Sequence, residues 1–229
     1  MLTPLEIEAM LLSIKVAVLA SLACLGPAIG VAWVLSRTQV PGRTLINVVA
    51  HAPLVLPPVV IGYLLLVTFG VKGPVGAWLN ETFGIRLVFS SAGAVLAAAV
   101  MAFPLMVRAV RLSLDAVDRG LELAAQTLGA TRLDAFVTVT LPLMLPGILA
   151  GVLMAFAASL GEFGATITFV SNVEGQTRTL PLAIYTATQV PDGDAAALRL
   201  VLIAIALSLV ALALSEWVER WARRTIHGP

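Results

Sequence analysis

The sequence predicts an all-α membrane protein, a polytopic helical bundle that forms a single transmembrane domain over residues 1–229. Hydrophobic residues make up 59% of the chain and charged residues only 12%, whereas ordinary globular domains carry about 25% charged residues. The apolar runs are continuous and rich in Leu, Ala and Val, without the alternation that a β-barrel requires. Lipid is therefore the expected solvent for most of this surface.

Five apolar segments are long enough to cross a bilayer, because helices of about 20 to 25 residues at about 1.5 Å per residue cover a hydrocarbon core near 30 Å. They are residues 11–35, 46–70, 89–108, 146–170 and 198–217. The apolar stretch 179–190 is too short to span, and we expect a short re-entrant or surface helix there on the outer side. A sixth span at that place would put the C-terminal arginines outside.

The distribution of basic residues between the loops predicts the orientation, since cytoplasmic loops carry the excess of Lys and Arg. One set of loops holds nine, Arg37, Arg43, Arg108, Arg111, Arg119, Arg132, Arg220, Arg223 and Arg224, and the opposite set holds five, Lys15, Lys72, Arg86, Arg178 and Arg199. This asymmetry favours an external N-terminus. It also places the C-terminus and the segment 109–145 in the cytoplasm.

The composition argues against several classes of function. The net charge of +1 gives no basic face for nucleic acid, and the single Cys24 excludes an internal disulfide or a cysteine zinc site. A phosphate-binding loop needs Gly-Lys-Ser/Thr, but Lys15 and Lys72 are followed by Val16 and Gly73. We therefore expect no ATPase site, bound cofactor or metal in this chain.

Three prolines interrupt the second predicted span. Pro53, Pro57 and Pro58 each remove a backbone donor, so this helix must kink or break. The freed carbonyl groups need protein or water partners in lipid, and this favours a position facing the bundle interior. The prolines are either a structural kink or part of a substrate pathway.

A polar segment of about twenty residues separates the third and fourth predicted spans. Leu121, Ala124, Ala125 and Leu128 recur at helical spacing and form one apolar stripe. Gly129 is a natural helix C-terminal residue that turns the chain. The pattern predicts a short helix followed by a glycine turn.

A second short helix is expected after this turn. Thr131 can cap it, Leu133 and Phe136 would lie on its apolar side, and Leu141-Pro142 would end it before the fourth span. The helix pair is either an interfacial amphipathic connector or a knob that docks in a groove of a cytoplasmic protein. Small residues at Ala124, Ala125 and Gly129 favour docking.

The spacing Ala124-Ala125-x3-Gly129, then nine residues to Val139, then Leu141-Pro142, resembles the EAA loop of ABC transporter permeases of the binding-protein-dependent importer class. The family pattern begins with Glu-Ala-Ala. Here Leu123 holds the usual Glu position, and Glu122 lies one residue earlier.

This resemblance implies a type I ABC importer permease in the inner membrane. Two copies would form the pathway as a homodimer, with a coupling loop at about 112–145 docked in each of two cytoplasmic ABC ATPase subunits. Those subunits would hold ATP and Mg, and a periplasmic or external oxyanion-binding protein would deliver the cargo.

The whole chain resembles the molybdate permeases within that class. The segments that carry the likeness are 51–66, 99–118, 159–172 and 177–189. Sulfate, thiosulfate and tungstate permeases have similar segments and remain alternatives for the cargo. A secondary transporter is a further alternative, but internal repeats and paired intramembrane charges would be expected there.

Polar residues in the fourth predicted span are candidates for a pathway or gate, together with Pro57 and Pro58. A carboxylate at the centre of a spanning helix costs about 2.5–3.5 kcal/mol, so Glu162 must face water or a partner. Ser159, Glu162 and Thr166 would form one polar stripe, which is either pathway lining or a buried structural network. Thr168 and Asn172, which could solvate a passing oxyanion, are alternatively helix-end caps.

Overall fold

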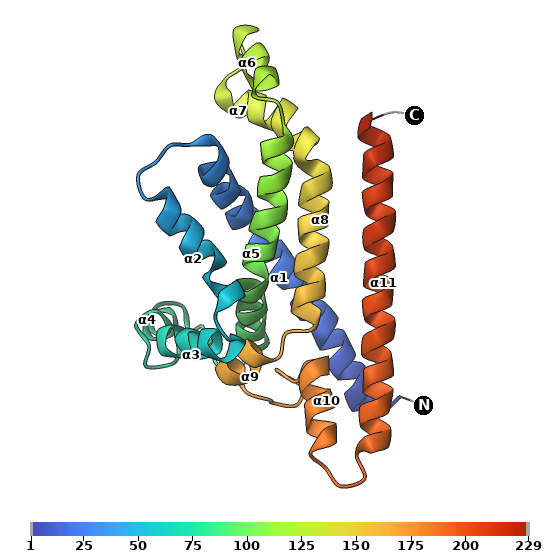
Figure 1. The fold of residues 1–229 in the computed structure, drawn as a ribbon. Coiled ribbons are helices and arrows are strands. Elements are labelled where there is room, and N and C mark those ends of the chain that lie inside the picture. The colour runs from blue at the N-terminus through green and yellow to red at the C-terminus, as the bar shows by residue number, and fades with distance from the viewer. Residues whose placement is uncertain (1, 228–229) are drawn as a thin grey trace.

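The computed structural model describes the backbone of residues 2–227; the side chains of residue 215 and of 218–227 lie outside this description. Every regular element in this range is helical (Figure 1). Four helices are long and apolar enough to cross a membrane, and a bent pair forms a fifth candidate. The all-α membrane bundle expected from the sequence is confirmed.

Three long helices form the core of the bundle, α1 (Pro4–Arg37), α5 (Ser91–Ala116) and α8 (Leu141–Leu160). Their facing sides are rich in fully buried alanines, among them Ala28, Ala94 and Ala97. Small side chains let helix backbones approach closely, which is how helices associate when lipid removes the hydrophobic drive. The fourth long helix, α11 (Asp194–His227), packs against α8 and α10 (Leu180–Thr188). The short α10 matches the helix expected at 179–190.

The second predicted span is not one helix. It divides into α2 (Arg43–Val55) and α3 (Pro58–Phe69), whose axes differ by 116°, and α4 (Pro74–Phe83) follows. Pro57 disfavours the helical conformation of Leu56, and Pro58 does the same to Pro57. Both residues are consequently extended, with ψ angles of 143° and 136°. Pro53 alone is accommodated inside α2.

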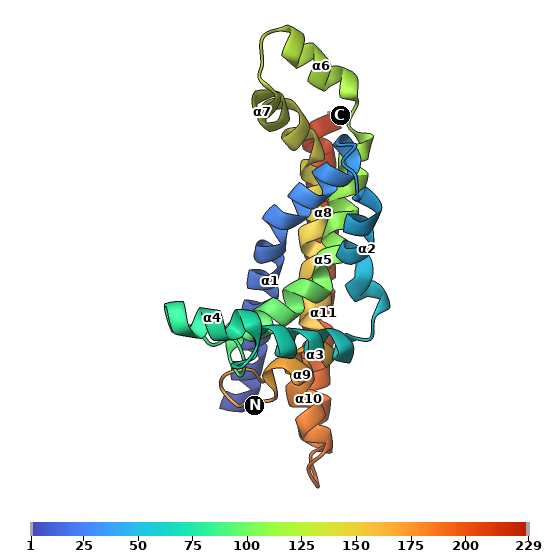
Figure 2. The same ribbon diagram turned by 90° about the vertical axis from the view of Figure 1, so that its left-hand side faces the viewer.

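The break predicted at the prolines is therefore confirmed, whereas the prediction of a continuous fourth span over 146–170 is wrong. The helix ends at Leu160, and a separate short helix, α9 (Gly164–Val170), follows after three residues. Gly161 and Gly164 flank the break, and glycine is a poor helix former. Figure 2 shows α3 and α9 beside each other near the end of the bundle opposite to α6.

The polar segment forms a hairpin of α6 (Arg119–Thr127) and α7 (Arg132–Ala135). Leu141-Pro142 does not end the second helix. A π-helical turn, Phe136–Thr140, joins α7 to α8, so one helix runs over Arg132–Leu160. Pro142 has no N–H for the usual bond to residue 138, and the wider turn accommodates this loss: the Leu141 N–H donates to the carbonyl of Phe136.

The third predicted span is longer than expected, since α5 continues to Ala116. Arg108 and Arg111 therefore belong to a helix rather than to a loop. The hairpin and the end of α11 lie at one end of the bundle, and the start of α1 lies at the other (Figures 1 and 2). This arrangement agrees with an odd number of crossings.

Candidate functional site

The hairpin of α6 and α7 is built from local capping interactions. Asp118 caps α6, with its carboxylate accepting from the Gly120 N–H at 2.8 Å. At the other end the Ala130 N–H donates to the Ala125 carbonyl and the Gly129 N–H donates to that of Gln126. These two bonds form a Schellman motif, which requires the left-handed conformation of Gly129, with φ +97°.

The second helix of the hairpin begins with a capping box. The Thr131 hydroxyl accepts from the Asp134 N–H at 3.2 Å, and the Asp134 carboxylate accepts from the Thr131 N–H at 3.1 Å. Two otherwise free donors are thus satisfied within four residues. The caps predicted at Gly129 and Thr131 are confirmed.

Several leucines of the hairpin are exposed. Leu123 is 61% exposed, Leu128 at the turn 90% and Leu133 70%. Ala124 is exposed beside them, while α6 as a whole contains no buried residue. Exposed leucines with small neighbours, Leu128 at the turn above all, are suited to packing into a groove on another protein.

The base of the hairpin is fixed to the bundle by a buried ion pair. The guanidinium of Arg37, at the end of α1, lies 3.1 Å from the Glu122 carboxylate, and these side chains are only 7% and 14% exposed. Arg37 also donates to the carbonyls of Leu114 and Val117, each at 3.0 Å. The hairpin, α1 and the end of α5 are therefore joined through one guanidinium.

Two further contacts support this junction. The Thr140 hydroxyl donates to the Glu122 carboxylate at 3.0 Å, and Arg119 donates to the carbonyl of Ser36 at 2.8 Å. Glu122 forms this ion pair although it lies one residue before the position that the glutamate occupies in the Glu-Ala-Ala pattern of the family. The sequence showed Arg37 only as a basic loop residue, because 85 positions separate it from Glu122 and no local pattern links them.

The two helix breaks meet at the other end of the bundle. A Cβ atom on Gly62 of α3 would lie 2.7 Å from the Ala165 carbonyl oxygen, and one on Gly164 would lie 2.7 Å from the Cβ of Pro58. The crossing of α3 and α9 therefore depends on two glycines. Pro57, Pro58 and Thr168, predicted separately as pathway candidates, are brought into one region.

Glu162 lies in the break between α8 and α9 rather than at the centre of a spanning helix. Its carboxylate accepts from the Ala165 N–H at 2.8 Å and so caps the start of α9. The break divides the predicted stripe, since Ser159 belongs to α8 and Thr166 to α9, where both are buried. The helical spacing of these three residues therefore does not apply.

The remaining candidates make local bonds. The Thr168 hydroxyl donates to the Gly164 carbonyl. The Asn172 amide donates to the Thr186 hydroxyl at 2.7 Å and accepts from Arg178 at 3.0 Å, so both of its polar atoms are engaged. The two bonds of Asn172 join the loop after α9 to α10 and to Arg178 before it, and they favour a structural role for Asn172.

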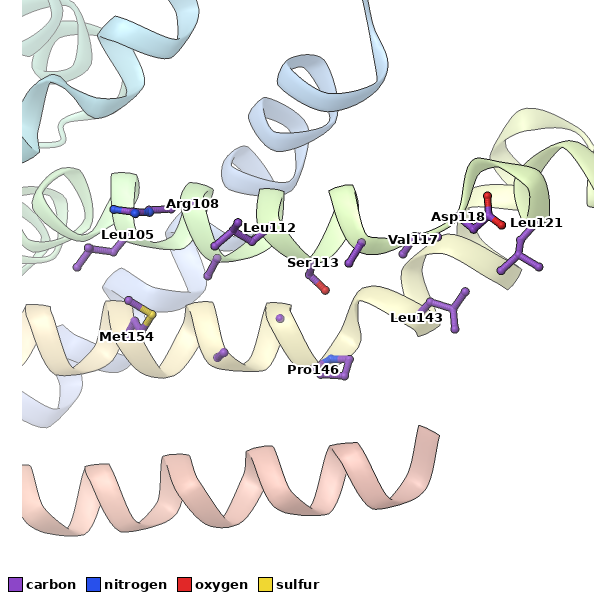
Figure 3. A pocket seen from close by; sticks show the side chains of 14 residues that line it. Leu105, Arg108, Leu112, Ser113, Val117, Asp118, Leu121, Leu143, Pro146 and Met154 are labelled. Carbon is purple, nitrogen blue, oxygen red and sulfur yellow. The ribbon is translucent and has the colours of Figure 1, made fainter. Parts of the chain in front are cut away.

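A groove of about 1110 Å³ opens between α5 and α8 near the hairpin (Figure 3). Leu105 and Ser113 point from α5 toward α8, and Arg108 also lines the groove. Arg108 is exposed and makes no ion pair within the described part of the chain. Charged side chains in membrane helices face a bundle interior or an aqueous cavity rather than lipid tails.

Comparisons with known proteins agree with this architecture. The chain is 57% identical over 222 residues to the molybdenum transport system permease protein ModB of Escherichia coli K12, with 97% of each chain covered. It is 56% identical over 215 residues, 94% of each chain, to the protein of that name from Haemophilus influenzae. The sulfate transport system permease protein CysT of Escherichia coli K12 is 35% identical over 195 residues, covering 85% of this chain and 70% of CysT.

Among solved structures, a bacterial ABC transporter that imports the acidic polysaccharide alginate matches with a TM-score of 0.73 at 18% identity. The match covers 98% of this chain and 81% of that one, and it shows a shared fold. The family model for binding-protein-dependent transport system inner membrane components matches residues 9–224. The chain therefore belongs to the family of membrane-spanning permease components of binding-protein-dependent transport systems.

Proposed function

We propose that the chain is the permease subunit of an ATP-driven importer for the oxyanion molybdate, and that two copies form the translocation pathway. The observation that carries this proposal is the identity of 57% across 97% of both chains to a molybdenum transport permease. The identity of the cargo is a more specific statement than the class of transporter, because the separate binding protein makes most of the choice between substrates. Sulfate, thiosulfate and tungstate are the alternatives.

The hairpin supports coupling to a cytoplasmic ATPase subunit. Its apolar tip, around Leu128, is free to enter a groove, while its base is held by Arg37 and Glu122. A rigid base and an exposed tip suit an element that transfers movement from a partner to the bundle. The proposal gives ATP and Mg to that partner and no ATPase site or cofactor to this chain.

The proposed orientation places the hairpin and the C-terminus in the cytoplasm and the N-terminus outside. The excess of arginines on the hairpin side supports it. The external end then presents α10 and the crossing of α3 and α9 to a substrate-binding protein.

The proposed pathway runs between the two copies, from the region of Pro57, Pro58 and Thr168 toward the groove at Arg108. Broken helices at membrane depth are tolerated where they are buried in protein or line an aqueous cavity. A guanidinium in the groove suits the passage of an anion better than contact with lipid tails.

Uptake by the reconstituted complex tests the cargo. The permease, its ATPase subunit and the binding protein are placed in proteoliposomes, and labelled molybdate is followed with excess sulfate or tungstate outside. The proposal expects uptake that requires ATP and persists in excess sulfate. Suppression of molybdate uptake by sulfate would instead identify the chain as a sulfate permease, and uptake without ATP would identify it as a secondary transporter.

A further inference from the structure

A second cavity lies beneath the hairpin and has a different character from the groove between α5 and α8. It measures about 400 Å³, opens to the surface and is bounded by the end of α1, by α6 and by the start of the helix that continues into α8. Liquid water occupies about 30 Å³ per molecule. The cavity therefore has room for a phosphate-sized anion together with several waters.

The charge of this cavity is strongly unbalanced. Three guanidiniums line it, those of Arg37, Arg119 and Arg132, against the single carboxylate of Glu122. That carboxylate is already paired with Arg37. Within the described part of the chain, the Arg119 guanidinium has only the neutral carbonyl of Ser36 as a partner, and the Arg132 guanidinium makes no hydrogen bond or ion pair.

A second observation concerns the hydrogen bonding of Arg37. The Nε of Arg37 is buried and has no hydrogen-bond acceptor among the described residues, although this side chain is only 7% exposed. A buried donor without a partner is costly, about 1–3 kcal/mol and more for a charged group. The guanidinium that lines the cavity therefore carries one N–H that no described group accepts, in addition to its bonds to Leu114, Val117 and Glu122.

The position of the cavity favours a lipid as the source of this anion. Trp33 and Phe136 form its apolar wall, with ring centroids 4.9 Å apart in an edge-to-face arrangement. Trp33 lies one turn before the end of α1, and tryptophan is enriched where membrane helices meet the headgroup region. Basic pockets between membrane helices on the cytoplasmic side are suited to anionic headgroups.

We propose that the cavity bounded by Arg37, Arg119 and Arg132 binds the phosphate of an anionic lipid headgroup, which, in the orientation proposed above, ties the base of the hairpin to the inner leaflet. Arg119 and Arg132 are both exposed: Arg132→Gln removes no side-chain hydrogen bond or ion pair within the described chain, and Arg119→Gln removes only the bond to the Ser36 carbonyl, so the single Arg132 variant separates lipid binding from any effect on the junction. Arg43 is the matched control, because it lies at the same end of the bundle, does not line the cavity and has no ion-pair partner within the described chain.

The test measures binding of phosphatidylglycerol to the purified full-length permease by native mass spectrometry, with phosphatidylcholine as the neutral comparison. One basic residue near an anionic surface contributes enough for about a fivefold change in binding, and two for about thirtyfold. We expect Arg132→Gln to weaken phosphatidylglycerol binding about fivefold and Arg119→Gln with Arg132→Gln about thirtyfold. Arg43→Gln should leave it unchanged.

Three outcomes would overturn the proposal. Equal losses in the control and the cavity variants would mean that binding follows total charge. Displacement of the lipid by free molybdate or phosphate at similar concentration would show that the ligand of the cavity is a soluble oxyanion instead. Unchanged lipid binding with weaker association of the ATPase subunit would assign the arginines to the protein partner.

Discussion

The hairpin and the crossing of α3 and α9 lie at opposite ends of the bundle and are stabilised in different ways. In the hairpin, each helix end is satisfied by residues within a few positions, such as Asp118 and Thr131. The crossing depends on two segments about a hundred residues apart that meet through Gly62 and Gly164. Local capping therefore determines the shape of the hairpin, whereas close packing between distant segments determines the shape of the proposed gate.

The largest expected effect concerns the junction between hairpin and bundle. Arg37→Ala leaves the Glu122 carboxylate buried without its partner and removes a donor from two carbonyls. Breaking one partner of a buried pair typically costs about 3–5 kcal/mol. We expect a clear loss of thermal stability in detergent, with no loss in Arg43→Ala. Equal stability of the two variants would show that the junction contributes little.

A smaller effect is expected at the helix crossing. Gly62→Ala forces a methyl group against Ala165 and Thr168, and such overpacking costs about 1–3 kcal/mol. Gly26→Ala is the matched control, because no atom lies within 4 Å of a Cβ at that position in α1. Its stability should stay the same or rise slightly. If both variants unfold at the same temperature, the crossing tolerates separation and is not tightly packed.

The capping box of α7 should contribute less. Thr131→Ala removes the acceptor for the Asp134 N–H, and loss of such a cap costs about 1 kcal/mol. Hydrogen exchange should become faster at residues 132–135 while α5 keeps its protection. Faster exchange throughout the bundle would contradict a local role.

The smallest effect is expected at Glu162. A glutamine keeps an oxygen that can accept from the Ala165 N–H and loses only the charge near the start of α9, worth about 0.3–1 kcal/mol. Folded yield of Glu162→Gln should fall slightly, and uptake per folded molecule should match the wild type. Altered uptake at unchanged yield would identify Glu162 as pathway lining instead.

The features that could be predicted from the sequence are those that neighbouring residues in the chain determine. The apolar runs gave the helical bundle, and Gly129 and Thr131 marked the turn and the second cap of the hairpin. The prolines indicated a break, but the 116° bend depends on two consecutive extended residues, Leu56 and Pro57.

The remaining features depend on contacts between distant segments. The stretch around Gly161 has the hydropathy of a continuous span, so the end of α8 could not be seen without its neighbour α3. The pairing of Arg37 with Glu122 is likewise invisible, because nothing near either residue indicates the other. A π-turn before Pro142 gives a continuous helix where the proline alone suggested an end.

The most direct test of the coupling role compares two glycines that have a left-handed backbone conformation at the same end of the bundle. Gly129 and Gly42 both have positive φ, +97° and +87°, and open space at the Cβ position, but only Gly129 lies in the hairpin. The measurement is ATP hydrolysis by the reconstituted complex, with and without molybdate-loaded binding protein. We predict that Gly129→Trp inserts normally and loses the stimulation, whereas Gly42→Trp retains it. Normal stimulation in Gly129→Trp would contradict the role of the hairpin.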